Sequence, residues 1–201
     1  MKKFVILGLA LTAFAGAAEA QSVSTTQTNS STVKSKLNAT VEDVQKDVSL
    51  TSAAIGNSLT VEGTSGSYVT NTQRFWGDAT AELNGTIRDV NGDVTATAAA
   101  IANSATINVD GAGSISNTQM ANYDPSATLN GTISDVAGDV SATAAAISNS
   151  ASISGDFGYA NSYQANGALV GSTANVTVRE VNASVTATSA AIGNSLSITG
   201  F

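Results

Sequence analysis

Residues 89–104 read D-V-N-G-D-V-T-A-T-A-A-A-I-A-N-S, and closely similar stretches occur in four successive parts of the chain. The counterparts begin at Asp43, Asp135 and Glu180, so the steps between equivalent residues are 46, 46 and 45. Internal similarity at a fixed period of this size is typical of proteins built from stacked structural repeats. We therefore expect four repeat units.

The units fill the chain behind a short N-terminal segment and leave no room for a separate domain. The third unit is one residue shorter, and the deletion lies between Asn149 and Gln164, because equivalent residues outside this interval keep a constant spacing. The predicted units are residues 22–67, 68–113, 114–158 and 159–201, which together make one repeat domain.

The first 20 residues have the features of a secretory signal peptide. Lys2 and Lys3 form a basic start, residues 4–18 are apolar, and the A-E-A at residues 18–20 fits the small-x-small cleavage rule. The apolar run is shorter than the roughly 20 residues that a transmembrane helix needs. The chain has no Cys, so neither disulfides nor a Cys-linked lipid anchor are expected. We expect cleavage after residue 20 and export.

The chain is acidic, with 8 Lys and Arg against 15 Asp and Glu, and loss of the signal peptide changes the net charge from −7 to −8. An acidic chain of this kind lacks the positively charged surface that binds nucleic acid or an anionic membrane. His and Cys are both missing from the sequence, which removes the commonest general base and the commonest transition-metal ligands. We expect neither an enzyme nor a cofactor.

Apolar and polar residues alternate at a period of two, which predicts strands with one buried face. The parity changes near Ala53 and Ala54, where we expect a corner. The alanine run 98–100 favours a helix by propensity, but its Thr, Val and Ile neighbours favour a strand. In the first unit one parity holds Val44, Val48 and Leu50, and the other holds Ile55, Leu59 and Val61.

These features predict an all-β fold: a repeat β-solenoid of four units of about 46 residues, with a cross-β, functional-amyloid-like character. At roughly 3.3 Å per residue, a unit that made a single coil would have a perimeter of about 150 Å. The sequence leaves open whether each unit forms one wide coil or two unlike coils.

In a solenoid, equivalent positions stack, so a conserved spacing of amides predicts a ladder of side chains. A stacked amide donates to one neighbour and accepts from the other, which satisfies a buried polar group. Asn also suits turns, and this alternative applies to both series. The predicted ladders are Asn57, Asn103, Asn149 and Asn194, with Ile55 and Leu59 on the same inward face, and Gln27, Gln73, Gln119 and Gln164.

Two acidic series repeat at the same spacing. Calcium takes oxygen ligands of this kind, but the glycine-and-aspartate nonapeptide of calcium-binding β-rolls is missing from the sequence. We favour a solvated acidic face, because exposed charge discourages sideways aggregation. The calcium candidates are Asp43, Asp89 and Asp135, followed by Glu180, and Asp47, Asp93 and Asp139, followed by Ser184.

The chain resembles curli-type secreted fibre subunits and the related holdfast-attachment proteins of bacterial cell surfaces. The resemblance rests on the signal peptide, on the Gln and Asn series, and on residues 89–104 with their counterparts, and it covers the whole mature chain. It implies export through an outer-membrane pore, a location at the cell surface or outside the cell, and a role as a fibre subunit or surface anchor in adhesion or biofilm structure.

The predicted partner is a second copy. Both ends of the repeat domain keep the interior pattern, so their strand edges can add another chain head to tail. A surface polysaccharide is a further candidate partner. One alternative is an outer-membrane β-barrel-associated protein, because residues 195–201 alternate and end in Phe, although the chain has few aromatics for a barrel. Another is a monomeric solenoid that binds ice or polysaccharide. Hydroxyl pairs such as Thr95 and Thr97 would form the flat surface of an ice-binding solenoid.

Overall fold

The computed structural model describes residues 12–14, 22–64 and 68–200, and every regular element in them is a β-strand. The predicted all-β class is thus confirmed, and these residues contain no helix that could span a membrane. Most of the predicted signal peptide lies outside the described residues. The strands are β1 (Thr12–Phe14), β2 (Ser22–Asn29), β3 (Val33–Val41), β4 (Val48–Thr64), β5 (Tyr68–Phe75), β6 (Ala79–Val90), β7 (Val94–Ala112), β8 (Ser114–Ala121), β9 (Ser126–Val136), β10 (Val140–Phe157), β11 (Ala160–Asn166), β12 (Gly171–Val181) and β13 (Val185–Thr199).

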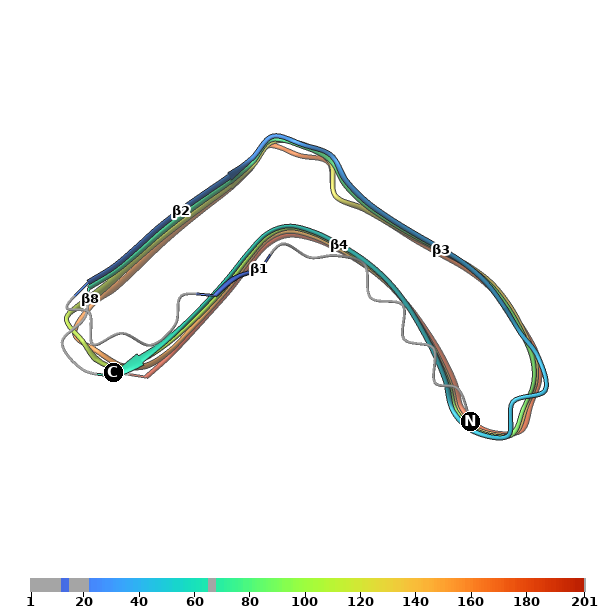
Figure 1. Cartoon of the computed structure of the whole chain (residues 1–201). Coiled ribbons are helices and arrows are strands. Elements are labelled where there is room, and N and C mark those ends of the chain that lie inside the picture. Colours follow the sequence, from blue (N-terminus) through green and yellow to red (C-terminus); the bar gives the residue numbers. More distant parts are fainter. Residues whose placement is uncertain (1–11, 15–21, 65–67, 201) are drawn as a thin grey trace.

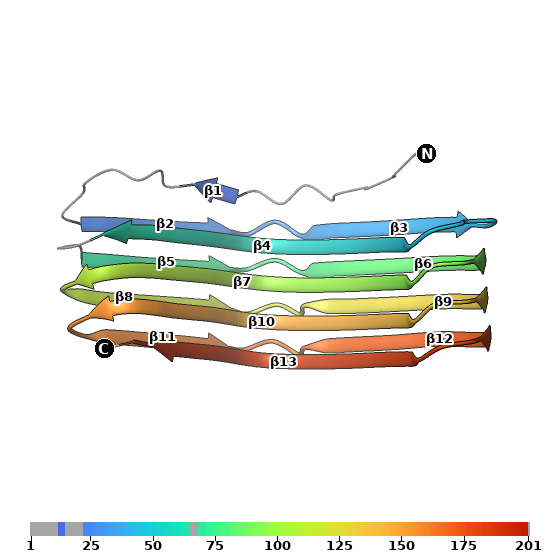
Figure 2. The ribbon, with the colours of Figure 1, turned by 90° about the horizontal axis from the view of Figure 1, so that it is seen from below.

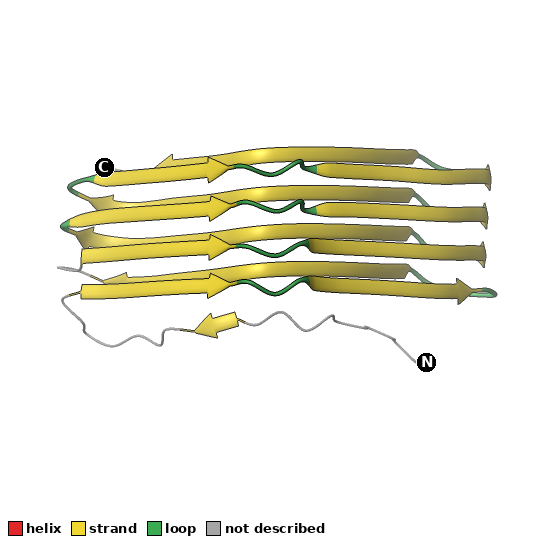
Figure 3. Cartoon of the chain, turned by 90° about the horizontal axis from the view of Figure 1, so that it is seen from above, coloured by secondary structure: helices red, strands yellow, loops and turns green. Residues whose placement is uncertain are grey.

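The strands form three parallel sheets. Sheet A has the order β1-β4-β7-β10-β13, sheet B the order β11-β8-β5-β2, and sheet C the order β12-β9-β6-β3. One strand from each of sheets B, C and A, in chain order, makes what we call a rung, so that rung 1 is β2, β3 and β4. Figures 2 and 3 show the rungs stacked on one another. Residues pair with their equivalents one unit away, as in Gln73 with Gln119, so each unit makes one wide circuit.

The core lies between two walls that face each other. Figure 1 looks down the stack and shows sheet A as one wall and sheets B and C together as the other, both bent in the middle. From Ala96 to Ala102, every inward side chain of β7 is an alanine, and this lets the walls approach closely. The alanine run 98–100 lies in a strand. Ala98 and Ala100 are fully buried, and on the same face Ala102 is fully and Ala96 almost fully buried.

The bend in sheet A lies later in the chain than the sequence suggested. Gly56 and Asn57 are consecutive and both buried, and position 56 drops out of the otherwise continuous register between β4 and β7. The parity change expected near Ala53 and Ala54 therefore lies about two residues later, and the expected inward position of Ile55 is wrong. Ile55 lies on the outer face of sheet A and is half-buried. An irregularity inside one strand shifts the parity, and only rungs 1 and 4 mark it with a glycine, at Gly56 and Gly193.

The one-residue deletion appears as a register shift at the end of β10. Asp156 pairs with Asp110 and Phe157 pairs with Ala112, so Gly111 is skipped. Gly111 has a positive φ of 73°, a conformation that glycine adopts without steric cost. The register shift between Asp156 and Phe157 falls inside the interval from Asn149 to Gln164 that the spacing predicts.

Candidate functional site

The Asn57 series forms a continuous chain of hydrogen bonds through the core at the bend. Asn57 Nδ2 donates to Asn103 Oδ1 at 2.7 Å, Asn103 Nδ2 to Asn149 Oδ1 at 2.8 Å, and Asn149 Nδ2 to Asn194 Oδ1 at 2.8 Å. The second N–H of each amide crosses to sheet B, as from Asn57 to the Arg74 carbonyl at 3.0 Å. The ladder thus links neighbouring rungs and also joins the two walls.

The Gln series forms a second ladder beside it, and its amides point the opposite way. Gln73 Nε2 donates to Gln27 Oε1 at 2.8 Å, and Gln119 and Gln164 repeat the contact at 2.8 and 2.7 Å. Each Gln also donates to a sheet A carbonyl, as from Gln73 to Ser104 at 2.8 Å. Donation runs toward rung 1 in the Gln ladder and toward rung 4 in the Asn ladder.

A third buried ladder in sheet B was missed at the sequence level. Asn71 Nδ2 donates to Asn117 Oδ1 at 2.7 Å, and hydroxyls occupy the equivalent positions at both ends. Thr25 Oγ1 donates to Asn71 Oδ1 at 3.1 Å, and Asn117 Nδ2 donates to Ser162 Oγ at 3.0 Å. The recurring Asn at the 46-residue spacing was a readable signal. Among the described residues, no buried side-chain nitrogen or oxygen lacks a partner.

The two acidic series lie at the corner between sheets C and A, and each has a structural role there. Asp47 Oδ1 accepts a hydrogen bond from the Asp93 N–H at 3.0 Å. Asp93 and Asp139 accept equivalent bonds at 2.8 and 2.9 Å from backbone N–H groups of the next rung toward rung 4. The other series has left-handed backbone, which Asp tolerates better than most residues. Its φ angles are 56° at Asp43, 53° at Asp89, 56° at Asp135 and 52° at Glu180.

The acidic corner carries little sign of a metal centre. No group of three or more His, Cys, Asp or Glu side chains in the described part of the chain is arranged to hold a metal ion. A hydrogen bond with Asp135, together with the charge of Asp135, raises the pKa of the Glu180 carboxyl.

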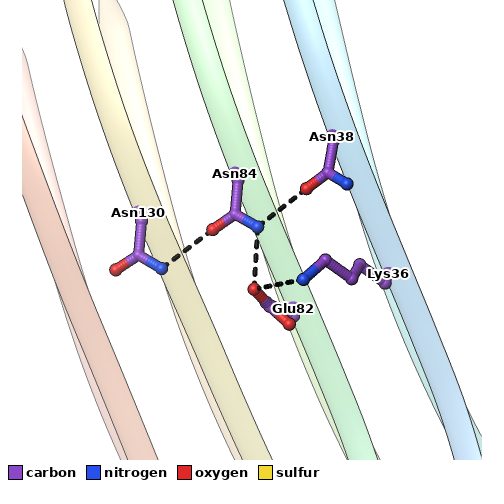
Figure 4. A network of polar contacts seen from close by, with 5 residues as sticks. All are labelled: Lys36, Asn38, Glu82, Asn84 and Asn130. Atoms are coloured by element: carbon purple, nitrogen blue, oxygen red, sulfur yellow. Dashed lines mark hydrogen bonds and ion pairs between the residues drawn. The ribbon is translucent and has the colours of Figure 1, made fainter.

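A fourth ladder lies outside the core, on the outer face of sheet C (Figure 4). Asn84 Nδ2 donates to Asn38 Oδ1 at 2.8 Å, Asn130 to Asn84 at 2.9 Å, and Asn175 to Asn130 at 3.1 Å. Beside the ladder, Glu82 accepts hydrogen bonds from Asn84 at 2.7 Å and Lys36 at 3.0 Å, and these two contacts lower the pKa of the Glu82 carboxyl. A shallow groove follows this ladder across the rungs.

In-register parallel strands and amide ladders along the whole stack define a repetitive all-β protein whose polar side chains serve mainly the stack itself. The chain belongs to the Holdfast attachment protein D family, whose model matches residues 10–160. This family supports the holdfast-attachment part of the resemblance, while the curli-like part stays a prediction. Neither the curated proteins nor the solved structures gave a match.

Proposed function

We propose that this protein is an exported β-solenoid of the cell surface that serves cell attachment by assembling head to tail into filaments. Membership of a holdfast attachment family supports the adhesive role and the surface location, and the predicted signal peptide supports export. The observation that carries the assembly step is the match between hydrogen-bonding groups at the two ends of the stack.

In the Asn ladder, a donor is left over at rung 4 and an acceptor at rung 1. Asn194 Nδ2 reaches only the Gln164 carbonyl, at 3.5 Å, and no described residue donates to Asn57 Oδ1. In the Gln ladder the ends are reversed, because rung 4 leaves Gln164 Oε1 as acceptor and rung 1 leaves an N–H of Gln27. A second copy placed on rung 4 would therefore continue both ladders, with a donor facing an acceptor in each.

The backbone edges match in the same way. The first residue of each sheet A strand in rungs 1 to 3 donates its N–H to a carbonyl of the next rung toward rung 4. These residues are Val48, Val94 and Val140, and the distance is 2.8 Å in all three cases. Val185 is the equivalent residue in rung 4, so its N–H is directed to an edge that no described strand of the molecule covers. Such an edge is a template for another strand. When rung 1 of each new copy adds to rung 4 of the copy before it, the contact never closes and an open filament results.

The test is assembly of the mature chain, residues 21–201, at high concentration. We expect filaments by negative-stain electron microscopy and a cross-β reflection near 4.7–4.8 Å along the filament axis. Val185→Pro removes an N–H that the single molecule does not use, at the first residue of an edge strand, where Pro is tolerated. This variant should fold like the wild type by circular dichroism but elongate several-fold more slowly.

The matched control is Val140→Pro, which removes the same N–H inside the molecule, where it donates to Ser184. This control should lower stability rather than act on assembly alone. A mature protein that stays monodisperse without the reflection, or a Val185→Pro variant that elongates at the wild-type rate, would overturn the head-to-tail proposal.

A further inference from the structure

The outer face of sheet A is concave and carries no charge. Figure 1 shows that sheet A bends in the middle, with its outer side in the hollow of the bend. The strand segments that form this face are residues 49–60, 95–106, 141–152 and 186–197. None of them contains an ionisable residue, although the chain as a whole has a net charge of −7. We call this surface the concave face.

An apolar stripe crosses the concave face beside the bend. Outward side chains two residues apart lie on the same face of a strand, and pairing between equivalent residues stacks them into one column of alanine and one of isoleucine. The isoleucines of rungs 1 to 3 are half-buried, and Ile192 in rung 4 is 37 % exposed. Hydroxyls flank the stripe, as at Thr97 and Ser104 in rung 2. The two columns are Ala53, Ala99, Ala145 and Ala190, and Ile55, Ile101, Ile147 and Ile192.

Large apolar side chains are exposed on the opposite, convex side of the same bend. The connection between sheets B and C lies there (Figure 1). Phe75 ends β5 with its ring buried beside Gly56 at the bend, and Trp76, the next residue, is 41 % exposed. In the same connection, Tyr123 of rung 3 is 51 % exposed and Leu169 of rung 4 is 81 % exposed. We call the side chains of Trp76, Tyr123 and Leu169 the ridge.

The ridge and the concave face complement each other in shape and in chemistry. Large apolar side chains that gather on a surface mark a contact site. The ridge stands on the outside of the bend and the apolar stripe lies on its inside, so the ridge of one copy fits the hollow of another with the rungs aligned. The carboxylates beside the ridge, Asp78 and Asp124, would meet the flanking hydroxyls and no like charge.

The concave face is large enough for a stable contact. At about 3.3 Å per residue and about 4.8 Å per rung, its four segments cover roughly 750 Å², and stable interfaces bury about 800 Å² on each partner. We infer that the concave face binds the ridge of a second copy, so that molecules associate side by side. Each copy contributes a different surface, so the contact can repeat. It goes beyond the head-to-tail assembly and does not depend on it, because it uses neither end of the stack.

The test uses the mature chain with Val185→Pro, a change at the end of the stack that leaves both lateral surfaces intact. Trp76 is the only tryptophan of the sequence, so its fluorescence reports burial of the ridge. With rising concentration, we expect its emission to move to shorter wavelength while sedimentation velocity shows dimers and larger species. A monomer with unchanged emission throughout would overturn the inference. Filament growth of the chain with Val185 intact is measured separately, so failure of either proposal is visible by itself.

In the same Val185→Pro chain, the ridge variant is Tyr123→Ser/Leu169→Thr, which introduces the hydroxyl residues that rung 1 has at the equivalent positions and keeps the tryptophan. Loss of two apolar side chains from the contact should raise the Kd for self-association roughly tenfold or more. The matched control is Tyr68→Ser/Tyr159→Ser. These tyrosines are exposed at the corner between sheets B and A, where rungs 1 and 3 carry Ser. The control should associate like its parent, and an equal loss in both variants would contradict the inference.

The face variant, again in the Val185→Pro chain, is Ile101→Thr/Ile147→Thr, which keeps a β-branched residue at both positions and should also weaken self-association. A mixture of the two variants tests the pairing of unlike surfaces. The intact ridge of the face variant fits the intact concave face of the ridge variant, so the mixture should form dimers and stop there, at concentrations where each variant alone is monomeric. Undiminished association of either variant by itself would show a contact between like surfaces and overturn the inference.

Discussion

At the scale of single residues, the fold solves the problem of buried amides by repetition. Asn103 and Gln119 are fully buried, yet every amide N–H of Asn103 has an acceptor, one in the next rung and one in sheet B. The Asn and Gln ladders donate in opposite directions, so their amide dipoles oppose each other within the same core. A side chain removed from one rung leaves groups unpaired in both neighbours, which makes the ladders sensitive to single substitutions.

We therefore predict that Asn103→Ala destabilises the protein more than Asn91→Ala. Asn103 has a bonded amide both below and above it, and an unsatisfied buried polar group costs roughly 1–3 kcal/mol. Asn91 also belongs to a side-chain pair, donating to Gln45 at 2.7 Å, but this pair is exposed, so water can replace the lost contact. Urea unfolding of both variants measures the difference in stability. Equal midpoints would show that the buried ladder contributes no more to stability than the exposed pair.

At the scale of the element, the bend in sheet A depends on a fit of small and large residues between the walls. A Cβ added at Gly56 would lie 2.4 Å from the Phe75 ring and 2.6 Å from the Ala102 carbonyl oxygen. Phe75 is fully buried, so its ring cannot swing out to solvent. In rung 3 the fit is polar instead, since Ser148 Oγ donates to Asn166 Oδ1 at 2.9 Å. The bend thus tolerates different residues when both walls change together.

Gly56→Ala should therefore destabilise the protein by about 1–3 kcal/mol, the usual cost of overpacking a core. Gly63→Ala, in the same strand, is the control, because its Cβ would meet only Val109 at 3.8 Å. That change should leave the stability unchanged or raise it slightly, because Ala lowers the conformational entropy of the unfolded chain. Thermal unfolding of the two variants checks the prediction, which fails if they melt together. The double variant Gly56→Ala/Phe75→Ala should lose less unfolding free energy than the two single variants lose together.

The sequence predicted the elements well where the repeat itself carries the information. Steps of 46, 46 and 45 residues are enough to align equivalent positions, and the Asn57 and Gln27 series follow from them directly. The bend was predicted about two residues too early, because apolar residues such as Ile55 occur on both faces of the strand and parity alone does not locate the irregularity. The role of Asp47 escaped because its partner is a backbone N–H, which no side-chain pattern records.

At the scale of the whole molecule, stability should be close to a sum over rungs and the interfaces between them. Deletion of residues 68–113 removes one period and should leave a folded protein of three rungs, because Asn57 then meets Asn149 and Gln27 meets Gln119. The unfolding free energy and its dependence on urea should both fall, since less surface is buried. Deletion of residues 68–90, half a period, breaks every ladder and should unfold the chain. Circular dichroism that shows both variants folded, or both unfolded, would contradict the modular account.

The last prediction concerns the N-terminal segment and the edge of the stack that it covers. β1 pairs in parallel with β4, with Thr12 opposite Ser58 and Phe14 opposite Thr60. In the register of the sheet, Ser58 is equivalent to Ser195 of β13 by way of Ser104 and Ser150. β1 therefore occupies the place that β13 of another copy would take in a filament. Since Thr12–Phe14 belongs to the predicted signal peptide, cleavage after residue 20 would open this edge.

We expect the uncleaved chain, residues 1–201, to fail to elongate by itself, because each new junction needs a free rung 1. Its rung 4 stays open, so it should still add to a mature filament and then stop growth at that end. A small fraction of uncleaved chain should accordingly shorten filaments of the mature protein, as measured by electron microscopy. Ala13→Pro in the uncleaved chain is the control, because Pro interrupts the pairing of β1 and should restore elongation. Uncleaved protein that elongates like the mature chain, or that is unaffected by Ala13→Pro, would show that β1 does not block the edge.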